Sequence, residues 1–65
     1  MEIKDVILTR VSERGISIAE LARRSSVNYQ LLRNSLHSDR LLKADELIRV
    51  SAELGLEIAD YAKAS

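Results

Sequence analysis

Cysteine, proline, tryptophan and phenylalanine are absent from this chain, and its 65 residues include only two glycines, two tyrosines and one histidine. Without cysteine, neither a disulfide framework nor a thiolate metal site can be built. One histidine, His37, cannot form a zinc site alone. We therefore expect no metal and no cofactor, and a fold that depends on a small apolar core.

Long apolar runs are missing too. The longest aliphatic runs, such as Val6-Ile7-Leu8, fall far short of the roughly 20 residues that a membrane-spanning helix requires. Residues 1–5 have neither the basic start nor the apolar stretch of a secretion signal. With the absence of cysteine, this predicts a soluble, cytoplasmic protein with no membrane partner. The initiating Met1 and the end at Ser65 suggest a complete small protein of one domain.

Opposite charges balance, with ten basic and ten acidic residues, which argues against nucleic-acid binding by bulk charge. The balance conceals an asymmetry along the chain. Residues 23–43 hold five bases and one acid, whereas residues 44–65 hold two bases and five acids. The first segment, with a net charge of +4, is therefore a candidate anion-binding surface, and the second, at −3, is not.

Apolar residues recur every three or four positions and predict an all-α fold. A first helix begins near residue 3 and ends at Gly15, because glycine takes the left-handed conformation of a helix end without steric cost. Ser17 opens a second helix. Glu20, three residues later, predicts a capping box in which each of these two side chains accepts from the other residue's backbone N–H.

Further helices are expected towards the C-terminus. Asn28 is the predicted N-cap of a third helix, about three residues after the second, and a loop follows at residues 38–40. A fourth helix should span about residues 44–54 and end at Gly55, and a short fifth helix should span about residues 57–63. We expect the fourth helix to turn four residues inward: Leu47, Ile48, Ser51 and Leu54.

The second and third helices, over about residues 17–37, have the lengths and the short connection of a helix-turn-helix. With Leu21-Ala22, Val27 and Leu32 in this motif, and ADELIRVSAELGLEI at residues 44–58, the chain resembles the helix-turn-helix family of phage repressors, Cro proteins and their bacterial relatives, the Xre family. The resemblance covers roughly residues 4–60. It implies a compact, lambda-repressor-like DNA-binding domain of four to five helices, in which the fourth supports the motif.

The resemblance also implies that the third helix enters the major groove of double-stranded DNA. The positions that resemble the family's base-contacting residues are Asn28, Tyr29, Gln30, Arg33 and Asn34. Amides can pair with adenine and a guanidinium with guanine, so their chemistry suits this role. The positions that resemble DNA-backbone contacts are Ser17, Arg23, His37, Arg40 and Lys43. Alternatively, Tyr29 and Leu31 cover the hydrophobic edge of the motif, and the polar face is merely solvated.

By this resemblance the chain is a Cro-like or repressor-like transcription regulator that binds a nearly palindromic operator as a homodimer, either preformed or assembled only on DNA. The candidate dimer seam contains Ile58 and Tyr61, although Tyr61 fits core packing equally well. The setting would be the cytoplasm of a bacterial cell or a phage-infected host, with the bound protein on the nucleoid. No small-molecule substrate is expected.

Three positions depart from the family pattern. Ser26 stands in the turn where glycine is usual, Ile18 stands where many members have a glutamine that reaches phosphate, and His37-Ser38 replaces a glycine. Ser26, Ile18 and the zero net charge favour an alternative. In that alternative, the same bundle is a protein-interaction module, such as an antirepressor or an antitoxin-like adaptor, with weak or no DNA binding.

We do not expect an enzyme or any catalytic residue. His37 and Asp39 flank Ser38, but neighbours in sequence do not form the geometry of a nucleophile, a base and an orienting group. Asp45 and Glu46 are best explained as charges at the start of a helix, where the helix dipole favours acidic side chains.

Overall fold

Five helices make up most of the part of the chain that the computed structural model describes, residues 2–62, and no strand occurs there. The helices are α1 (Ile3–Arg14), α2 (Ile18–Ser25), α3 (Tyr29–His37), α4 (Ala44–Leu54) and α5 (Ile58–Ala62). This confirms the predicted all-α class and the order of elements. Residue 63, which we expected in the fifth helix, lies outside the described residues.

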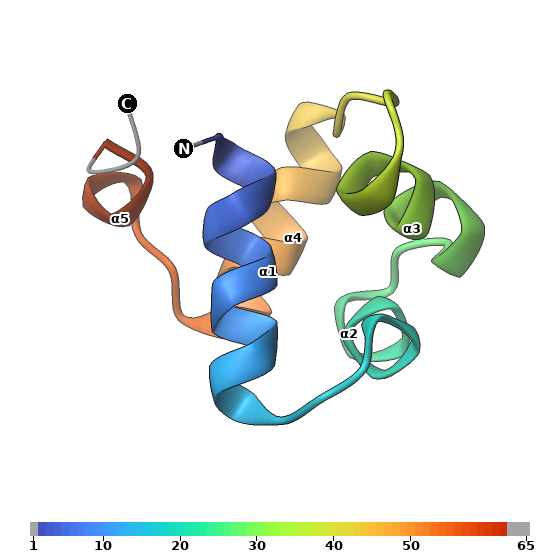
Figure 1. Ribbon diagram of the computed structural model, residues 1–65, viewed down its shortest axis with the longest axis horizontal. Coiled ribbons are helices and arrows are strands. Elements are labelled where there is room, and N and C mark those ends of the chain that lie inside the picture. Colours follow the sequence, from blue (N-terminus) through green and yellow to red (C-terminus); the bar gives the residue numbers. More distant parts are fainter. Residues whose placement is uncertain (1, 63–65) are drawn as a thin grey trace.

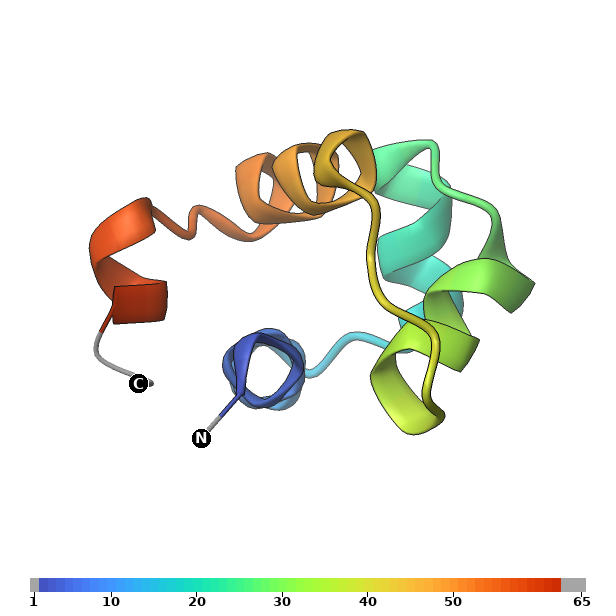
Figure 2. The same cartoon turned by 90° about the horizontal axis from the view of Figure 1, so that it is seen from above.

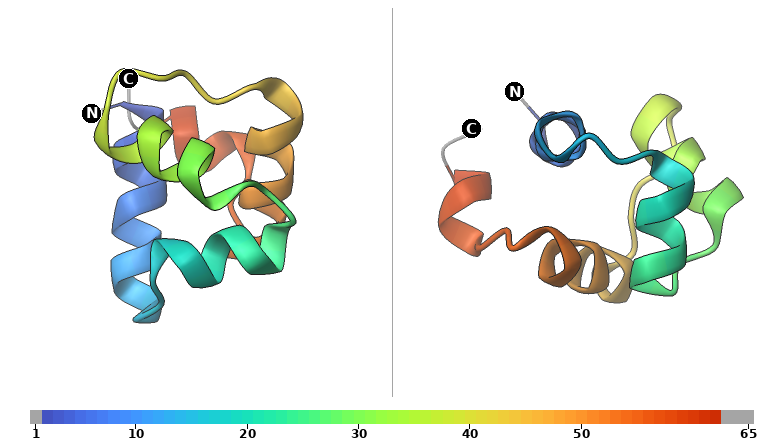
Figure 3. Two further views of the ribbon diagram at one scale, coloured as in Figure 1. Left: turned by 90° about the vertical axis from the view of Figure 1, so that its right-hand side faces the viewer. Right: turned by 90° about the horizontal axis from the view of Figure 1, so that it is seen from below.

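The helices are arranged so that α2 and α3 lie on one side of the molecule and α5 lies on the opposite side (Figures 1 and 2). Between them, α1 contacts α3, α4 and α5, while α2 packs against α3 and α4. When the molecule is turned by 90°, α2 and α3 are the helices nearest the viewer (Figure 3). Helix α3 therefore has one side towards the core and another towards solvent.

The core draws on each of the first four helices. Six of its side chains are completely buried: Ile7, Leu21, Leu32, Leu36, Val50 and Leu54. Burying one such side chain stabilises a fold by roughly 1.5–3 kcal/mol, so this cluster is the main source of stability. It also fixes which side of each helix is left for solvent.

The inner face of α4 differs from our prediction in one residue. Ile48 is 68% exposed, whereas Val50, which we had not placed inside, is completely buried. The other three expected residues do turn inward: Leu47, Ser51 and Leu54. The buried positions are 46, 50 and 54, at the four-residue spacing of one helix face. The prediction included neither Glu46 nor Val50 in this face, although both are buried.

Three helices end in the left-handed backbone conformation. Gly15 and Gly55 end α1 and α4 with φ of 67° and 68°, as predicted. Ser26 ends α2 with φ of 58°, and it is the only non-glycine residue with a positive φ in the described chain. The Val27 N–H still donates to the Ala22 carbonyl at 3.0 Å, as in a glycine-capped helix. The turn is thus kept with serine, at a cost of about 1 kcal/mol.

Helix α2 begins with half of the predicted capping box. Ser17 Oγ accepts from the Glu20 N–H at 3.0 Å. The Glu20 carboxylate, which we expected to accept from the Ser17 N–H, instead accepts from Arg23 and Arg24. These guanidinium groups lie three and four residues further along the helix, within reach of Glu20, and a charged donor bonds more strongly than a neutral N–H.

The C-terminal end of α4 is held by α1. Arg10 Nη1 and Arg14 Nη2 both donate to the Leu54 carbonyl, at 2.8 and 2.9 Å. The last carbonyls of a helix have no partner within the helix and carry partial negative charge. The two arginines therefore satisfy this carbonyl and tie the two helices together.

Candidate nucleic-acid interface

Helix α3 begins at a side-chain cap and has one buried face. Asn28 Oδ1 accepts from the Leu31 N–H at 3.1 Å, which satisfies one of the free N–H groups of the first turn and confirms the predicted N-cap. The buried residues of the helix are Leu32, Ser35 and Leu36. Because side chains three and four residues apart share a helix face, Gln30 and Asn34 are left on the opposite face, and Arg33 lies beside them.

The predicted base-contacting residues lie together on this outer face. Gln30 and Arg33 are exposed, Asn34 is half-buried, and Gln30 Nε2 donates to Asn34 Oδ1 at 3.3 Å. No hydrogen bond or ion pair engages the Arg33 guanidinium within residues 2–62. The face therefore carries two amides side by side and one unengaged cation.

Two apolar or aromatic side chains flank these polar groups. Tyr29 is 45% exposed and Leu31 is 39% exposed. This agrees with their placement towards solvent rather than beneath the motif. Asn28 is exposed as well, with its carboxamide oxygen committed to the helix cap.

Four of the five residues expected at the DNA backbone have exposed positions on three different elements. Ser17 and Arg23 belong to the start and end of α2, His37 is the last residue of α3, and Lys43 directly precedes α4. Arg23 and Arg24 share the carboxylate of Glu20, and these two hydrogen bonds lower the pKa of Glu20 to about 2. At neutral pH this part of α2 therefore has two cations held by one anion.

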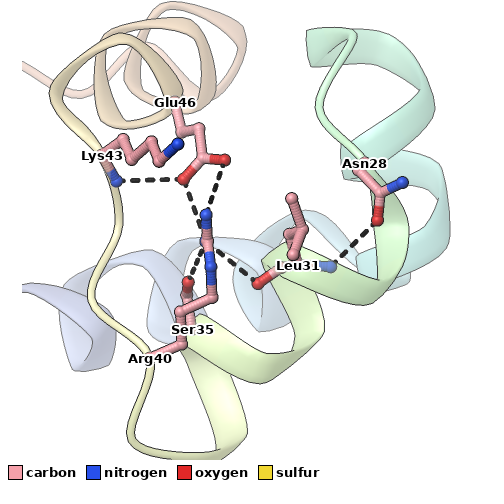
Figure 4. Close-up of polar contacts among 6 residues, drawn as sticks. All are labelled: Asn28, Leu31, Ser35, Arg40, Lys43 and Glu46. Carbon is pink, nitrogen blue, oxygen red and sulfur yellow. Dashed lines mark hydrogen bonds and ion pairs between the residues drawn. The ribbon is translucent and has the colours of Figure 1, made fainter.

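The structure places the fifth residue, Arg40, differently. Its guanidinium points into the gap between α3 and α4, where Nη1 and Nη2 donate to the two carboxylate oxygens of Glu46 at 3.0 and 3.1 Å (Figure 4). Nη1 also donates to Ser35 Oγ at 2.8 Å and approaches the Leu31 carbonyl at 3.4 Å. The side chain is thus engaged by the protein on both sides.

Glu46 has a larger role than the helix-start charge that we predicted. Its side chain is 11% exposed, and Oε1 also accepts from the Lys43 N–H at 3.0 Å. The hydrogen bonds from Arg40 first, and from the Lys43 backbone second, hold its pKa below the ordinary value. Burial opposes this effect, and the net result is a carboxylate that is ionised at neutral pH.

The two candidate dimer residues differ in burial. Tyr61 is half-buried against the core, and its hydroxyl lies 2.6 Å from Ser51 Oγ, whereas Ile58 is 88% exposed. Burial raises the pKa of the Tyr61 phenol. Tyr61 therefore packs on the core, which was one of its two predicted roles, while Ile58 remains available to a partner.

A groove of about 820 Å³ lies beside Ile58. It is lined by the start of α1, the segment 38–42, α5 and single residues of α3 and α4, and its lining combines aliphatic side chains with polar and charged ones. Ile3, Leu41 and Ile58 all line it, and Leu41 is 87% exposed. Sequence reasoning missed Leu41, because the pair Leu41-Leu42 stands in a loop with no periodic pattern around it.

Arg49 is a second residue that sequence reasoning missed. It is exposed on α4, and Nη1 approaches the Ser26 carbonyl at 3.4 Å, so it braces the turn between α2 and α3. It lies in the acidic part of the sequence, residues 44–65, whose negative net charge argued against an anion-binding surface there. Its position four residues after Asp45, on the face opposite the apolar stripe, was the available signal.

No group of three or more potential metal ligands occurs among the described residues. Within the same part of the chain, no helix has the length and apolar character needed to cross a membrane.

Comparison with known proteins gives no further guidance. No protein-family model, curated protein or solved structure matches this chain.

Proposed function

We propose that this chain is a sequence-specific, double-stranded DNA-binding transcription regulator whose helix α3 enters the major groove. The observation that supports this most is the outer face of α3, where Gln30, Arg33 and Asn34 stand together above a wholly buried opposite face. Amide and guanidinium groups have the donors and acceptors that distinguish base pairs, and the major groove is about as wide as one helix.

The charges around α3 support the same proposal. Helix α3 has no acidic residue, and Arg23, Arg24 and Lys43 are exposed on the neighbouring segments. Phosphate contacts from such residues fix the register of a protein on DNA and make its affinity depend on salt. A chain of zero net charge can therefore bind DNA through one face.

We further propose that two copies bind a nearly palindromic operator whose half-sites lie about one helical turn apart. The exposed apolar groove supports this, with Ile3, Leu41 and Ile58 on one end of the molecule. A stable dimer buries about 800 Å² on each partner. That is close to a fifth of the 4274 Å² of accessible surface, which is a large share for a chain of this size, so we expect the dimer to assemble on DNA.

A protein-interaction module is the second candidate function. The observation that favours it is again the groove, since Leu41 and Ile58 are almost fully exposed and the chain has no net charge. Exposed apolar patches of this kind mark sites of protein contact. In this case the polar face of α3 is only a solvated surface.

Selection from a random duplex library at low salt separates the two candidates. We expect an enriched inverted repeat, and we expect Gln30→Ala and Asn34→Ala each to lose preference at one or two base pairs, by about 1–3 kcal/mol. Thr9→Ala, an exposed change on α1, is the matched control and should leave the preference unchanged. Absence of enrichment by protein that is folded by circular dichroism would contradict DNA binding and favour the interaction module.

A further inference from the structure

We infer that Arg40 is a positioning residue that fixes the orientation of α3, and not a phosphate contact. This rests on the proposed function of α3 as the helix that reads DNA. It assigns a role to a side chain on the segment between α3 and α4, outside the outer face of α3.

The geometry of Arg40 joins two helices at one point. On one side its guanidinium holds both carboxylate oxygens of Glu46 on α4, and on the other it donates to Ser35 and to the Leu31 carbonyl of α3 (Figure 4). Leu31 and Ser35 are one helical turn apart. Contact at two successive turns restrains both the tilt of a helix and its rotation about its axis.

This restraint acts next to the outer face of α3. Leu31 directly follows Gln30 in the sequence, and Ser35 directly follows Asn34. One residue corresponds to about 100° of rotation, since a turn holds 3.6 residues. A rotation of α3 by even a fraction of that angle would turn both amides away from a base edge, because hydrogen bonds weaken steeply when misaligned.

Burial makes the alternative role unfavourable. The side chains of Arg40 and Glu46 are 23% and 11% exposed. For the Arg40 guanidinium to turn towards a DNA phosphate, it would have to leave the Glu46 carboxylate buried without its charged partner, which is strongly destabilising, so only its remaining N–H groups could meet a phosphate. An exposed arginine carries no such cost.

The test compares Arg40→Gln with Glu46→Gln in the full chain, using the selected operator and a scrambled duplex at several salt concentrations. If Arg40 positions α3, both variants should lower the ratio of operator to scrambled affinity, by about tenfold, the worth of one good base contact. The salt slope on the scrambled duplex should not change. The double variant should lose no more than either single variant, because the two residues act as one unit.

A phosphate contact gives the opposite pattern. Arg40→Gln would lower the salt slope by about 0.9 with no change in the ratio, and Glu46→Gln would strengthen binding by removing an acid near DNA. That outcome overturns the inference. Lys43→Ala, at an exposed cation next to α4, calibrates the slope expected for a true phosphate contact.

A measurement without DNA separates this inference from the proposed function. Backbone amide exchange in residues 31–36 of the free, folded protein should become faster in Arg40→Gln and in Glu46→Gln, relative to exchange in α1. In Arg40→Lys, which keeps the charge but loses the bidentate geometry, the same amides should be only partly protected from exchange. If no DNA preference is found for the unaltered chain, the proposed function fails. Faster exchange confined to α3 would still support the restraint, and unchanged exchange would overturn it.

Discussion

Glu20 and Glu46 both accept hydrogen bonds from arginine side chains, but Glu20 does so on the surface of α2 and Glu46 does so between α3 and α4. The partners of Glu20 lie three and four residues away on the same helix, whereas Arg40 reaches Glu46 from a different segment. A surface pair is screened by water and is easily exchanged for another partner. A buried pair holds the elements that it joins, and each partner depends on the other.

The largest expected effect is on stability when the buried pair is broken. Glu46→Ala should lower the free energy of unfolding by about 2 kcal/mol, because it leaves the Arg40 guanidinium half-buried without its anion. Asp45→Ala is the matched control, since Asp45 is the exposed neighbour on the same first turn of α4. Urea unfolding followed by circular dichroism measures the stability of both variants. Equal midpoints for Glu46→Ala and Asp45→Ala would contradict a special role of the buried pair in stability.

The next effect is on the pH dependence of unfolding. The pKa of Glu46 is held below its ordinary value of 4.5, by Arg40 first and by the Lys43 N–H second. A carboxylate with a lowered pKa in the folded state stabilises the fold fully above its unfolded pKa, and this stabilisation is lost as pH falls through the folded pKa. Thermal unfolding should therefore become easier below about pH 4.5, and Glu46→Gln should flatten that decline. If stability at low pH declines as steeply in Glu46→Gln as in the unaltered chain, other carboxylates cause the decline.

The smallest effect on stability is expected at the surface pair. Glu20→Gln removes the anion that holds Arg23 and Arg24, and it should leave the urea midpoint unchanged because the pair is exposed. Its effect should instead appear on DNA, where each arginine released to a phosphate steepens the salt slope by about one unit. A shifted midpoint with an unchanged slope would show that the surface pair serves the fold.

The local features of the fold could be predicted from the sequence, because each has its signal within a few residues. Asn28 was recognisable as a cap, and Gly15 and Gly55 as helix ends, from residue type and position alone. The outward placement of Gln30 and Arg33 likewise follows from the spacing of the apolar residues around them.

What could not be predicted depends on how the helices and the loop between α3 and α4 pack against one another. Arg40 was expected at the DNA backbone from the family resemblance, and nothing in its neighbours showed that Glu46 would face it from α4. Ile48 and Val50 are both apolar, and only the packing of α4 on the other helices decides which of them is inside. DNA binding itself stays a prediction, which the duplex selection tests.

The two arginines of α1 that donate to the Leu54 carbonyl have a consequence for how the chain is made. They connect residues 40 and 44 positions apart, across most of the molecule's sequence. A nascent chain emerges from its N-terminus, so α1 is synthesised long before its acceptor exists. Until Leu54 leaves the ribosome, Arg10 and Arg14 have no carbonyl of α4 to hold, so the docking of α1 on α4 must wait for residue 54.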